Sequence, residues 1–248
     1  MCADITACVI LIGNELLSGR TQDTNLAHLG KELDGLGVRL REARVVRDDI
    51  DEIVETVNEC RAKFNYVFTT GGIGPTHDDI TTECIARAFG VTVVQSDDAV
   101  QLMSAHYKNT ELTEARLKMA RVPEGATLIE NPVSGAPGYC MDNVYVFAGI
   151  PRIMTAMFES IRHRLRGGPP MRSRSVAAYL GEGVVALGLS EIQYRYQDVG
   201  IGSYPFVRDG RFGTSLVLRS VDAARLDAAY NEVRDMIEGC NGKPIDGA

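Results

Sequence analysis

The sequence lacks the features that mark several classes of protein. Its 26 Lys and Arg residues form no cluster and the formal net charge is −7, so we expect no nucleic-acid-binding surface. No apolar run is long enough to span a bilayer, and residues 1–13 lack the basic start of a secretory signal and read as a strand. We therefore expect a cytoplasmic protein that has no membrane partner.

Cysteine pairs at metal-binding or redox spacing are also missing. The six cysteines contain no CxxC motif, and several lie within apolar runs; they are Cys2, Cys8, Cys60, Cys84, Cys140 and Cys240. A disulfide framework or a zinc knuckle is therefore not expected, and buried thiols in a reducing compartment are the plain interpretation.

What is present is the composition of a globular protein, with 45% hydrophobic and 24% charged residues over 248 positions. Up to about residue 165, buried strands alternate with amphipathic helices, a pattern typical of an α/β sheet covered by helices on both faces. Residues 166–170 (RGGPP) read as a linker, and a β-α-β-β-α pattern follows, with a short helix predicted to begin at Ser190. We predict an α/β domain over residues 1–168 and a small α+β domain over residues 173–248.

The most informative stretch is residues 66–90, in which an apolar strand leads into a glycine-rich turn and then a helix. We call residues 71–79 (GGIGPTHDD) the glycine loop. Glycines let backbone N–H groups approach a phosphate, and the start of a helix adds partial positive charge. Asp78 and Asp79 would repel a bare phosphate, so we predict a divalent cation between these carboxylates and the phosphate oxygens.

A purely structural interpretation stays open beside this one. Thr76 and Asp79 have the spacing of a capping box, and the three glycines could serve a tight turn alone. Asp48 is likewise an ordinary helix cap or a site residue. Arg20, Arg44 and Arg47 are candidates to clamp a phosphate, although such arginines are often plain surface charges.

In sheets of this kind, ligands bind beyond the carboxyl ends of the strands. The loops at 13–20, 71–79 and 149–151 each follow a strand, so we expect them to share one rim. The loop at 131–138 precedes its strand, and we expect it to reach that rim only by folding over it.

Several motifs resemble one family when taken in order. They are GNELLSG (13–19), TN (24–25), GGIGPTHDDIT (71–81), VPEGA (122–126), NP…GAPG (131–138) and GIP (149–151). Together they resemble the molybdopterin-binding (MoaB/Mog-like) domain of the competence/damage-inducible CinA family, over residues 5 to about 165. The later part of the chain is similar to the segment that follows the equivalent domain in eukaryotic FAD synthases, notably at Gly202-Ser203-Tyr204-Pro205. The resemblance implies a three-layer α/β/α sandwich with a mostly parallel sheet.

The resemblance also implies roles for the matching residues. Asp79 and Asp48 would be acids of the site by the resemblance. The physical mechanism that we favour, cation-assisted hydrolysis of a P–O–P bond, adds Asp78 as a third catalytic acid and has Asp78, Asp79 and Glu15 hold a divalent metal (Mg, Mn or Co). The residues that would bind the ligand are Gly13, Asn14, Glu15, Ser18, Gly19, Asn25, Gly71, Gly72, Gly74, Pro75, Thr76, Thr81, Gly135, Pro137, Gly138 and Pro151.

Three functions follow as alternatives. In the resembling families the domain is associated with metal-dependent pyrophosphatase activity on ADP-ribose or FAD, which we favour here. The second is binding of molybdopterin for cofactor biosynthesis by adenylation or metal insertion, and the third is a non-catalytic ligand-binding module. The chain is too short to add the amidase domain of some CinA proteins. Relatives form dimers or trimers, so we expect a homo-oligomer whose partner is a small nucleotide or pterin.

Overall fold

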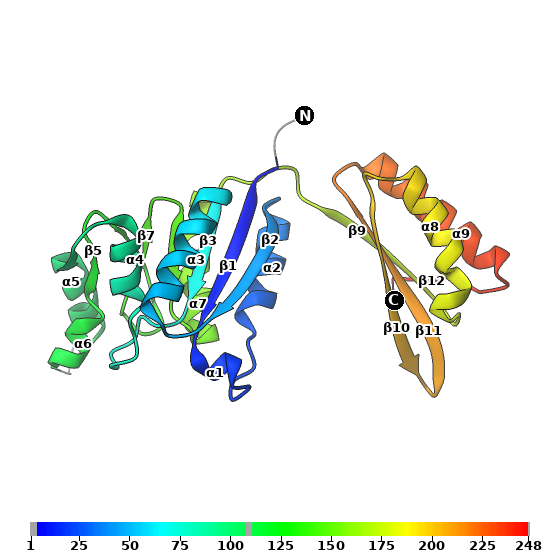
Figure 1. Ribbon diagram of the computed structural model, residues 1–248. Coiled ribbons are helices and arrows are strands. Elements are labelled where there is room, and N and C mark those ends of the chain that lie inside the picture. Colours follow the sequence, from blue (N-terminus) through cyan, green and yellow to red (C-terminus); the bar gives the residue numbers. More distant parts are fainter. Residues whose placement is uncertain (1–3, 108–110, 248) are drawn as a thin grey trace. The chain divides into compact units, whose positions relative to one another are not determined.

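The computed structural model describes residues 4–107 and 111–247. It divides into two compact units, residues 1–168 (the N-terminal unit) and residues 169–248 (the C-terminal unit), and the division falls within the RGGPP segment (Figure 1). Each unit has its own hydrophobic core. Cys2 lies outside the described residues, and the other cysteines are free thiols.

The N-terminal unit is built on a six-stranded sheet with the order β2-β1-β3-β8-β7-β6. The first four strands are mutually parallel, and β7 and β6 are antiparallel additions at one edge. In sheet order the strands are β2 (Arg39–Val46), β1 (Thr6–Ile12), β3 (Tyr66–Thr70), β8 (Val144–Phe147), β7 (Gly138–Met141) and β6 (Thr127–Ile129).

Helices cover both faces of this sheet, as Figure 1 shows. The alternating side chains of β1 divide between the two cores: Cys8, Ile10 and Ile12 belong to one and Ala7, Val9 and Leu11 to the other. Side chains of α3 (Ile50–Lys63) and α4 (Thr81–Phe89) complete the first core. Those of α2 (Asn25–Gly35) and α7 (Pro151–Ile161) complete the second. The predicted three-layer α/β/α sandwich is confirmed.

The remaining elements of this unit are short. A two-stranded antiparallel sheet joins β4 (Val93–Gln95) to β5 (Arg121–Pro123). The others are α1 (Asn14–Leu17), α5 (Asp97–His106), α6 (Glu114–Lys118) and the 3-10 turn η1 (Arg162–Arg164). Throughout the part of the chain that the structure describes, no helix has the length and apolar character needed to cross a membrane.

Helix boundaries follow local capping chemistry, with one difference from the predictions. Of the adjacent acids Asp48 and Asp49, Asp49 caps α3, as its spacing from Glu52 predicts, because its carboxylate accepts the N–H of Glu52 at 3.0 Å. The capping-box interpretation of Thr76 and Asp79 is wrong, since α4 begins only at Thr81, after a turn that these two residues close themselves.

The loop at residues 131–138 reaches the rim by a route that the sequence analysis did not predict. It leads into β7, which is antiparallel to β8, so the start of β7 lies at the same edge as the end of β8. The loop therefore begins at the rim and does not need to fold over the sheet. The run of Gly and Pro before Tyr139 hid this strand from the sequence pattern.

The C-terminal unit has the order β-α-β-β-α-β, with an antiparallel sheet β10-β11-β9-β12. Its elements are β9 (Arg172–Ala178), α8 (Glu182–Arg195), β10 (Gly200–Arg208), β11 (Arg211–Ser220), α9 (Ala223–Gly239) and β12 (Ile245–Asp246). Helices α8 and α9 pack on one face of the sheet around a single core. Strands β10 and β11 form a hairpin whose turn is Asp209-Gly210, a pair typical of such turns, and both residues have positive φ.

The prediction of a short helix that begins at Ser190 is wrong. Ser190 lies inside α8, and its hydroxyl donates to the carbonyl of Ala186, one turn earlier, at 2.9 Å. Gly188 is needed for packing, because a Cβ there would lie 2.6 Å from Cγ of Met236 on α9. Glycines that normally signal a loop are therefore inside a helix here.

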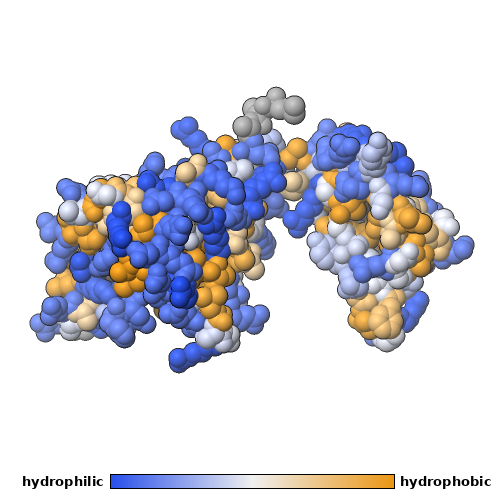
Figure 2. Space-filling model, in the orientation of Figure 1, coloured by the Kyte–Doolittle hydropathy of each residue, from blue (hydrophilic) through white to orange (hydrophobic). Residues whose placement is uncertain are grey.

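Strand β10 is an edge strand whose open side is partly closed. The register places the N–H groups of Ile201, Ser203 and Val207 on that side. The side-chain oxygen of Gln193 accepts the N–H of Ile201 at 3.1 Å, and Pro205 has no N–H to offer. Hydrophobic side chains remain exposed at the tip of the β10–β11 hairpin, as Figure 2 shows, where Phe212 is 76% exposed.

Candidate functional site

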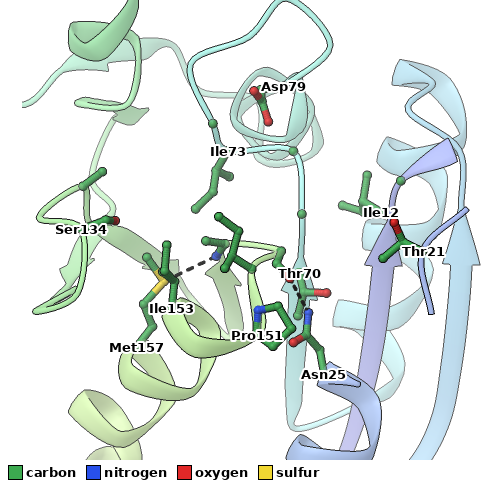
Figure 3. Close-up of a pocket in the computed structure, with 18 of the residues that line it drawn as sticks. Ile12, Thr21, Asn25, Thr70, Ile73, Asp79, Ser134, Pro151, Ile153 and Met157 are labelled. Carbon is green, nitrogen blue, oxygen red and sulfur yellow. Dashed lines mark hydrogen bonds between the residues drawn. The ribbon is translucent and has the colours of Figure 1, made fainter. Parts of the chain in front are cut away.

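A large cavity of the N-terminal unit lies at the carboxyl ends of its parallel strands. Its volume is about 650 Å³, within the range of ligand pockets. Residues from all four loops of the predicted rim line it, so the expectation of a shared rim is met. Figure 3 shows Ile12, Ile73 and Ile153 directed toward the same space from β1, the glycine loop and α7.

Most of the predicted site residues surround this cavity. Those that line it are Gly13, Glu15, Asn25, Asp48, Gly71, Gly72, Gly74, Pro75, Asp78, Asp79, Pro137 and Pro151. The predicted residues that do not line it are Asn14, Ser18, Gly19, Thr76, Thr81, Gly135 and Gly138. Several of the second group support the first, as their hydrogen bonds show.

The start of the glycine loop is held in a form that only glycine allows. Gly71 has φ 105°, and a Cβ there would lie 2.2 Å from the carbonyl oxygen of Ile12 on the neighbouring strand. Gly72 has φ 68°, and its Cβ would meet the hydroxyl of Thr81 at the same separation, 2.2 Å. The buried Thr81 hydroxyl donates to the Gly71 carbonyl at 3.0 Å. Helix α4 and strand β1 together therefore fix this turn.

The loop leaves backbone donors unused at the cavity. Among the described residues, no hydrogen-bond acceptor is found for the N–H groups of Gly72, Ile73 and Gly74, which all line the cavity. Successive unpaired N–H groups in a turn make a concave site for an anion. The turn precedes the N-terminus of α4, a nine-residue helix.

Thr76 ties the two aspartates of the loop to each other. Its hydroxyl lies 2.6 Å from Oδ1 of Asp78 and also contacts Oδ2 of Asp79, which accepts the Thr76 N–H at 2.8 Å. The hydrogen bond from Thr76 lowers the pKa of Asp78, so this exposed carboxylate stays ionised. On the other side of the loop, the Lys118 ammonium donates to the carbonyl oxygens of Thr76 and Asp79.

The opposing loop is organised by two further acids. Oδ2 of Asp48 accepts the N–H of Asn14 at 2.9 Å, which fixes the turn that carries Glu15. Asp23 accepts the N–H groups of Asn25 and Leu26 at the start of α2.

Asn25 and Asn131 hold the remaining walls. The buried Asn25 amide donates to the carbonyl of Gly149 at 2.8 Å and so joins α2 to the loop before α7, as Figure 3 shows. The amide of Asn131 donates to the carbonyl of Ala136 at 2.7 Å, and its oxygen accepts the N–H of Ser134. The loop at 131–138 is therefore closed on itself and presents Ser134 and Ala136 to the cavity.

The charge of the lining is of one sign. Five carboxylates line the cavity (Glu15, Asp23, Asp48, Asp78 and Asp79), and no Lys or Arg does so within the described residues. The predicted phosphate clamps Arg44 and Arg47 are wrong, because they pair elsewhere: Arg44 with Glu42 and Glu59, and Arg47 with Glu52. Arg20 does not line the cavity either, and His77 is exposed outside it.

These carboxylates do not form a complete metal site by themselves. In the described part of the chain, no three His, Cys, Asp or Glu side chains come together in a group able to hold a metal ion. The predicted set Asp78, Asp79 and Glu15 is therefore not preformed. The adjacent pair Asp78 and Asp79 instead suits Mg²⁺, which usually takes one or two carboxylates and completes its shell with phosphate oxygens and water.

Sequence reasoning missed several residues that contact or support the site. Thr21, Tyr107 and Met119 line the cavity, and Lys118 supports the glycine loop from behind. Tyr107 and Met119 belong to the segment around α5 and α6, more than 25 residues beyond the loop, and no local pattern brings them there. Thr21 could have been found, since it follows a loop already assigned to the rim.

Comparisons with known proteins agree with this architecture. The family model described as "Probable molybdopterin binding domain" matches residues 8–167, and the model described as "FAD synthase, middle domain" matches residues 170–241. An Archaeoglobus fulgidus protein is 36% identical over 197 residues, covering 79% of this chain and 84% of its own. A Saccharolobus islandicus protein is 37% identical over 208 residues, 79% of each chain.

A solved structure is also similar. The crystal structure of the protein CinA, of unknown function, from Thermoplasma acidophilum matches with a TM-score of 0.61 and 36% identity. The match covers 65% of this chain and 98% of that one.

Proposed function

The chain belongs to the family of probable molybdopterin binding domains, and from this premise we propose that its cavity binds a pyrophosphate-containing nucleotide or pterin and hydrolyses the P–O–P bond. The observation that carries the proposal is the row of unpaired N–H groups at Gly72, Ile73 and Gly74 on the cavity wall. Such a row binds phosphate oxygens without any basic side chain.

The acidic lining supports a requirement for a divalent cation. A pyrophosphate would meet five carboxylates and no basic side chain among the described lining residues, so its charge has to be offset by a cation that enters with it. Asp78 and Asp79 are the residues that would hold this metal. When bound, the metal would neutralise phosphate charge and lower the pKa of a bound water.

The chain's own residues have distinct tasks in this proposal. The glycine-loop amides orient the pyrophosphate, and the Thr76 hydroxyl keeps Asp78 ionised and ready to bind a cation. The apolar side of the cavity, with Ile12, Ile73 and Ile153, accepts the flat ring system of a nucleotide or pterin and excludes water.

A metal-by-ligand matrix tests the proposal. ADP-ribose and FAD are each incubated with Mg²⁺, Mn²⁺ or Co²⁺ or with EDTA, and AMP release is followed by chromatography. We expect release only with metal, and a loss of about 100-fold or more in Asp79→Asn. The amide oxygen of that variant could still accept the Thr76 N–H, so the fold should be retained. Asp51→Asn is the matched control, because Asp51 is exposed on α3 and pairs with Arg87. Metal-independent release, or full activity in Asp79→Asn, would contradict the proposal.

The family description favours a second candidate, binding of molybdopterin for cofactor biosynthesis. Under that alternative the purified protein carries a fluorescent pterin and leaves FAD intact in every metal. A non-catalytic binding module would instead raise its melting temperature with ligand and release no AMP.

A further inference from the structure

We propose that Lys118 is a positioning residue: it holds the turn of the glycine loop from Thr76 to Asp79 with two carbonyl oxygens turned away from the bound anion, and it adds positive potential beside Asp78 and Asp79. This inference rests on the proposed function for the identity of the ligand. It assigns a task to a residue that lies outside the glycine loop and outside the lining of the cavity.

The hydrogen bonds of Lys118 are the first evidence. Lys118 is the last residue of α6, and its ammonium donates to two carbonyl oxygens of one turn, those of Thr76 and Asp79, the second at 2.9 Å. These contacts join positions about 40 residues apart in the chain, and Lys118 as a whole residue is half-buried. A carbonyl oxygen held in this way cannot turn toward a phosphate.

Peptide geometry supplies the second step. The C=O of one residue and the N–H of the next lie in one plane and point in opposite directions when the bond is trans. The described chain has no cis peptide bonds, so the N–H groups of His77 and Ile80 point away from the ammonium. Neither N–H has a hydrogen-bond partner among the described residues, and neither residue lines the cavity, so these two groups contribute positive potential at the loop and do not contact the ligand.

Charge gives the third step. A cation bound to a carbonyl oxygen polarises the peptide group and makes its N–H a stronger donor. Lys118 therefore delivers positive potential to the acidic loop through the backbone, while its side chain remains outside the lining of the cavity. This arrangement adds anion affinity without bringing an ammonium into contact with the ligand, where it would compete with the divalent cation for Asp78 and Asp79.

Binding measurements on the full chain test the inference. The probe is imidodiphosphate with excess Mg²⁺, a pyrophosphate analogue that resists hydrolysis, and its Kd is measured by calorimetry. We expect Lys118→Met to weaken binding about 10-fold or more, because two charge-assisted hydrogen bonds are lost. Lys118→Arg should recover affinity to within about 3-fold, since its N–H groups can reach the same carbonyls.

Arg121→Met is the matched control. Arg121 is near Lys118, carries the same charge and pairs with Glu83 at 3.4 Å, but it does not bond to the loop. We expect its affinity to stay within about 2-fold of the unmodified protein. Equal losses of affinity in Lys118→Met and Arg121→Met would mean that any positive charge in this region has the same effect, and this result would overturn the inference. Wild-type affinity in Lys118→Met would overturn it as well.

Hydrogen exchange separates this inference from the proposed function. The N–H groups of Thr76 and Asp79 are hydrogen-bonded within the loop, and in Lys118→Met their exchange should accelerate about 5-fold or more without any ligand present. Binding of the probe with unchanged exchange would show that the loop is ordered without Lys118. If the unmodified protein binds no probe, the proposed function fails, and unchanged exchange in the variant would then remove the positioning role too.

Discussion

The carboxylates that line the cavity differ in their partners from the carboxylates of the C-terminal unit. In the C-terminal unit they pair with arginines: Asp198 with Arg225, Glu232 with Arg195, and Asp246 with Arg234, at 2.6 to 2.8 Å. Around the cavity of the N-terminal unit, the five lining carboxylates form no ion pair with Lys or Arg within the described residues. Three of them accept backbone N–H groups instead.

The difference separates two uses of an acid. A carboxylate already neutralised by arginine contributes a modest amount to stability and has little capacity left for a ligand. A carboxylate that only shapes a loop keeps its charge for a cation that arrives with the substrate. Acids without a basic partner around a cavity therefore indicate a ligand-binding role. Acids paired with arginine on a sheet and its helices indicate a role in the stability of the fold.

Deforming the glycine loop should give the largest effect, because it should change both the stability of the N-terminal unit and its ligand binding. In Gly71→Ala the new Cβ would lie 2.2 Å from the Ile12 carbonyl at a φ of 105°. We expect the free energy of unfolding to fall by about 3 kcal/mol and ligand binding to be lost. Urea denaturation followed by circular dichroism measures the first, and calorimetry measures the second. A variant as stable as the parent would show that the β1–β3 contact is not rigid.

Exchanging one carboxylate for an amide in each unit sharpens the comparison. Asp78→Asn should weaken binding of the Mg²⁺–imidodiphosphate complex about 10-fold and leave the urea midpoint nearly unchanged. Glu232→Gln should do the reverse: binding is unaffected, and stability falls by less than about 1 kcal/mol, since the pair with Arg195 is partly exposed. The comparison fails if both variants change the same property.

Acid should weaken the C-terminal unit through its paired carboxylates. Hydrogen bonds from Arg195 lower the pKa of Glu232, and those from Arg225 lower the pKa of Asp198. A carboxyl whose pKa is lower in the folded state stabilises the fold above its unfolded value, about 4, and this stabilisation is lost as the pH falls through the folded value. Urea midpoints between pH 7 and pH 3 should fall less steeply in Glu232→Gln than in the parent.

A glycine outside the loop should give the smallest effect. Gly35 lies in the last turn of α2, and a Cβ there would meet no atom within 4 Å. We expect Gly35→Ala to raise the free energy of unfolding by about 0.5 kcal/mol and to leave ligand affinity unchanged. Destabilisation here would mean that glycine is also required in this unit for reasons unrelated to the cavity.

The sequence predicted those parts of the molecule that depend on local pattern. Short apolar runs and helical spacing located the sheet and its covering helices, and the strand-following loops at 13–20, 71–79 and 149–151 line the same cavity. Local pattern failed where tertiary packing decides. Gly188 of α8 is a packing contact with α9, and β7 forms in spite of the Gly and Pro before it because β8 lies alongside.

Long-range contacts account for most of what was missed at the site. Lys118 ends the short helix α6 and Met119 comes directly after it; neither belongs to a motif, and only the fold brings them to the glycine loop. The prediction that arginines bind the phosphate was wrong because long-range contacts pair these arginines with carboxylates. Arg44 lies on β2, and its neighbours Glu42 and Glu59, from β2 and α3, bind it before any ligand can.

The edge of β10 has a consequence for how chains meet in a crowded solution. An unprotected strand of nine residues invites a second chain to extend the sheet, the first step toward fibres. Gln193 and Pro205 each remove one N–H donor from that side, so an incoming strand finds an N–H donor at only two of four positions. Resistance to fibre growth through this sheet is therefore assigned to two side chains that touch neither the cavity nor its loops.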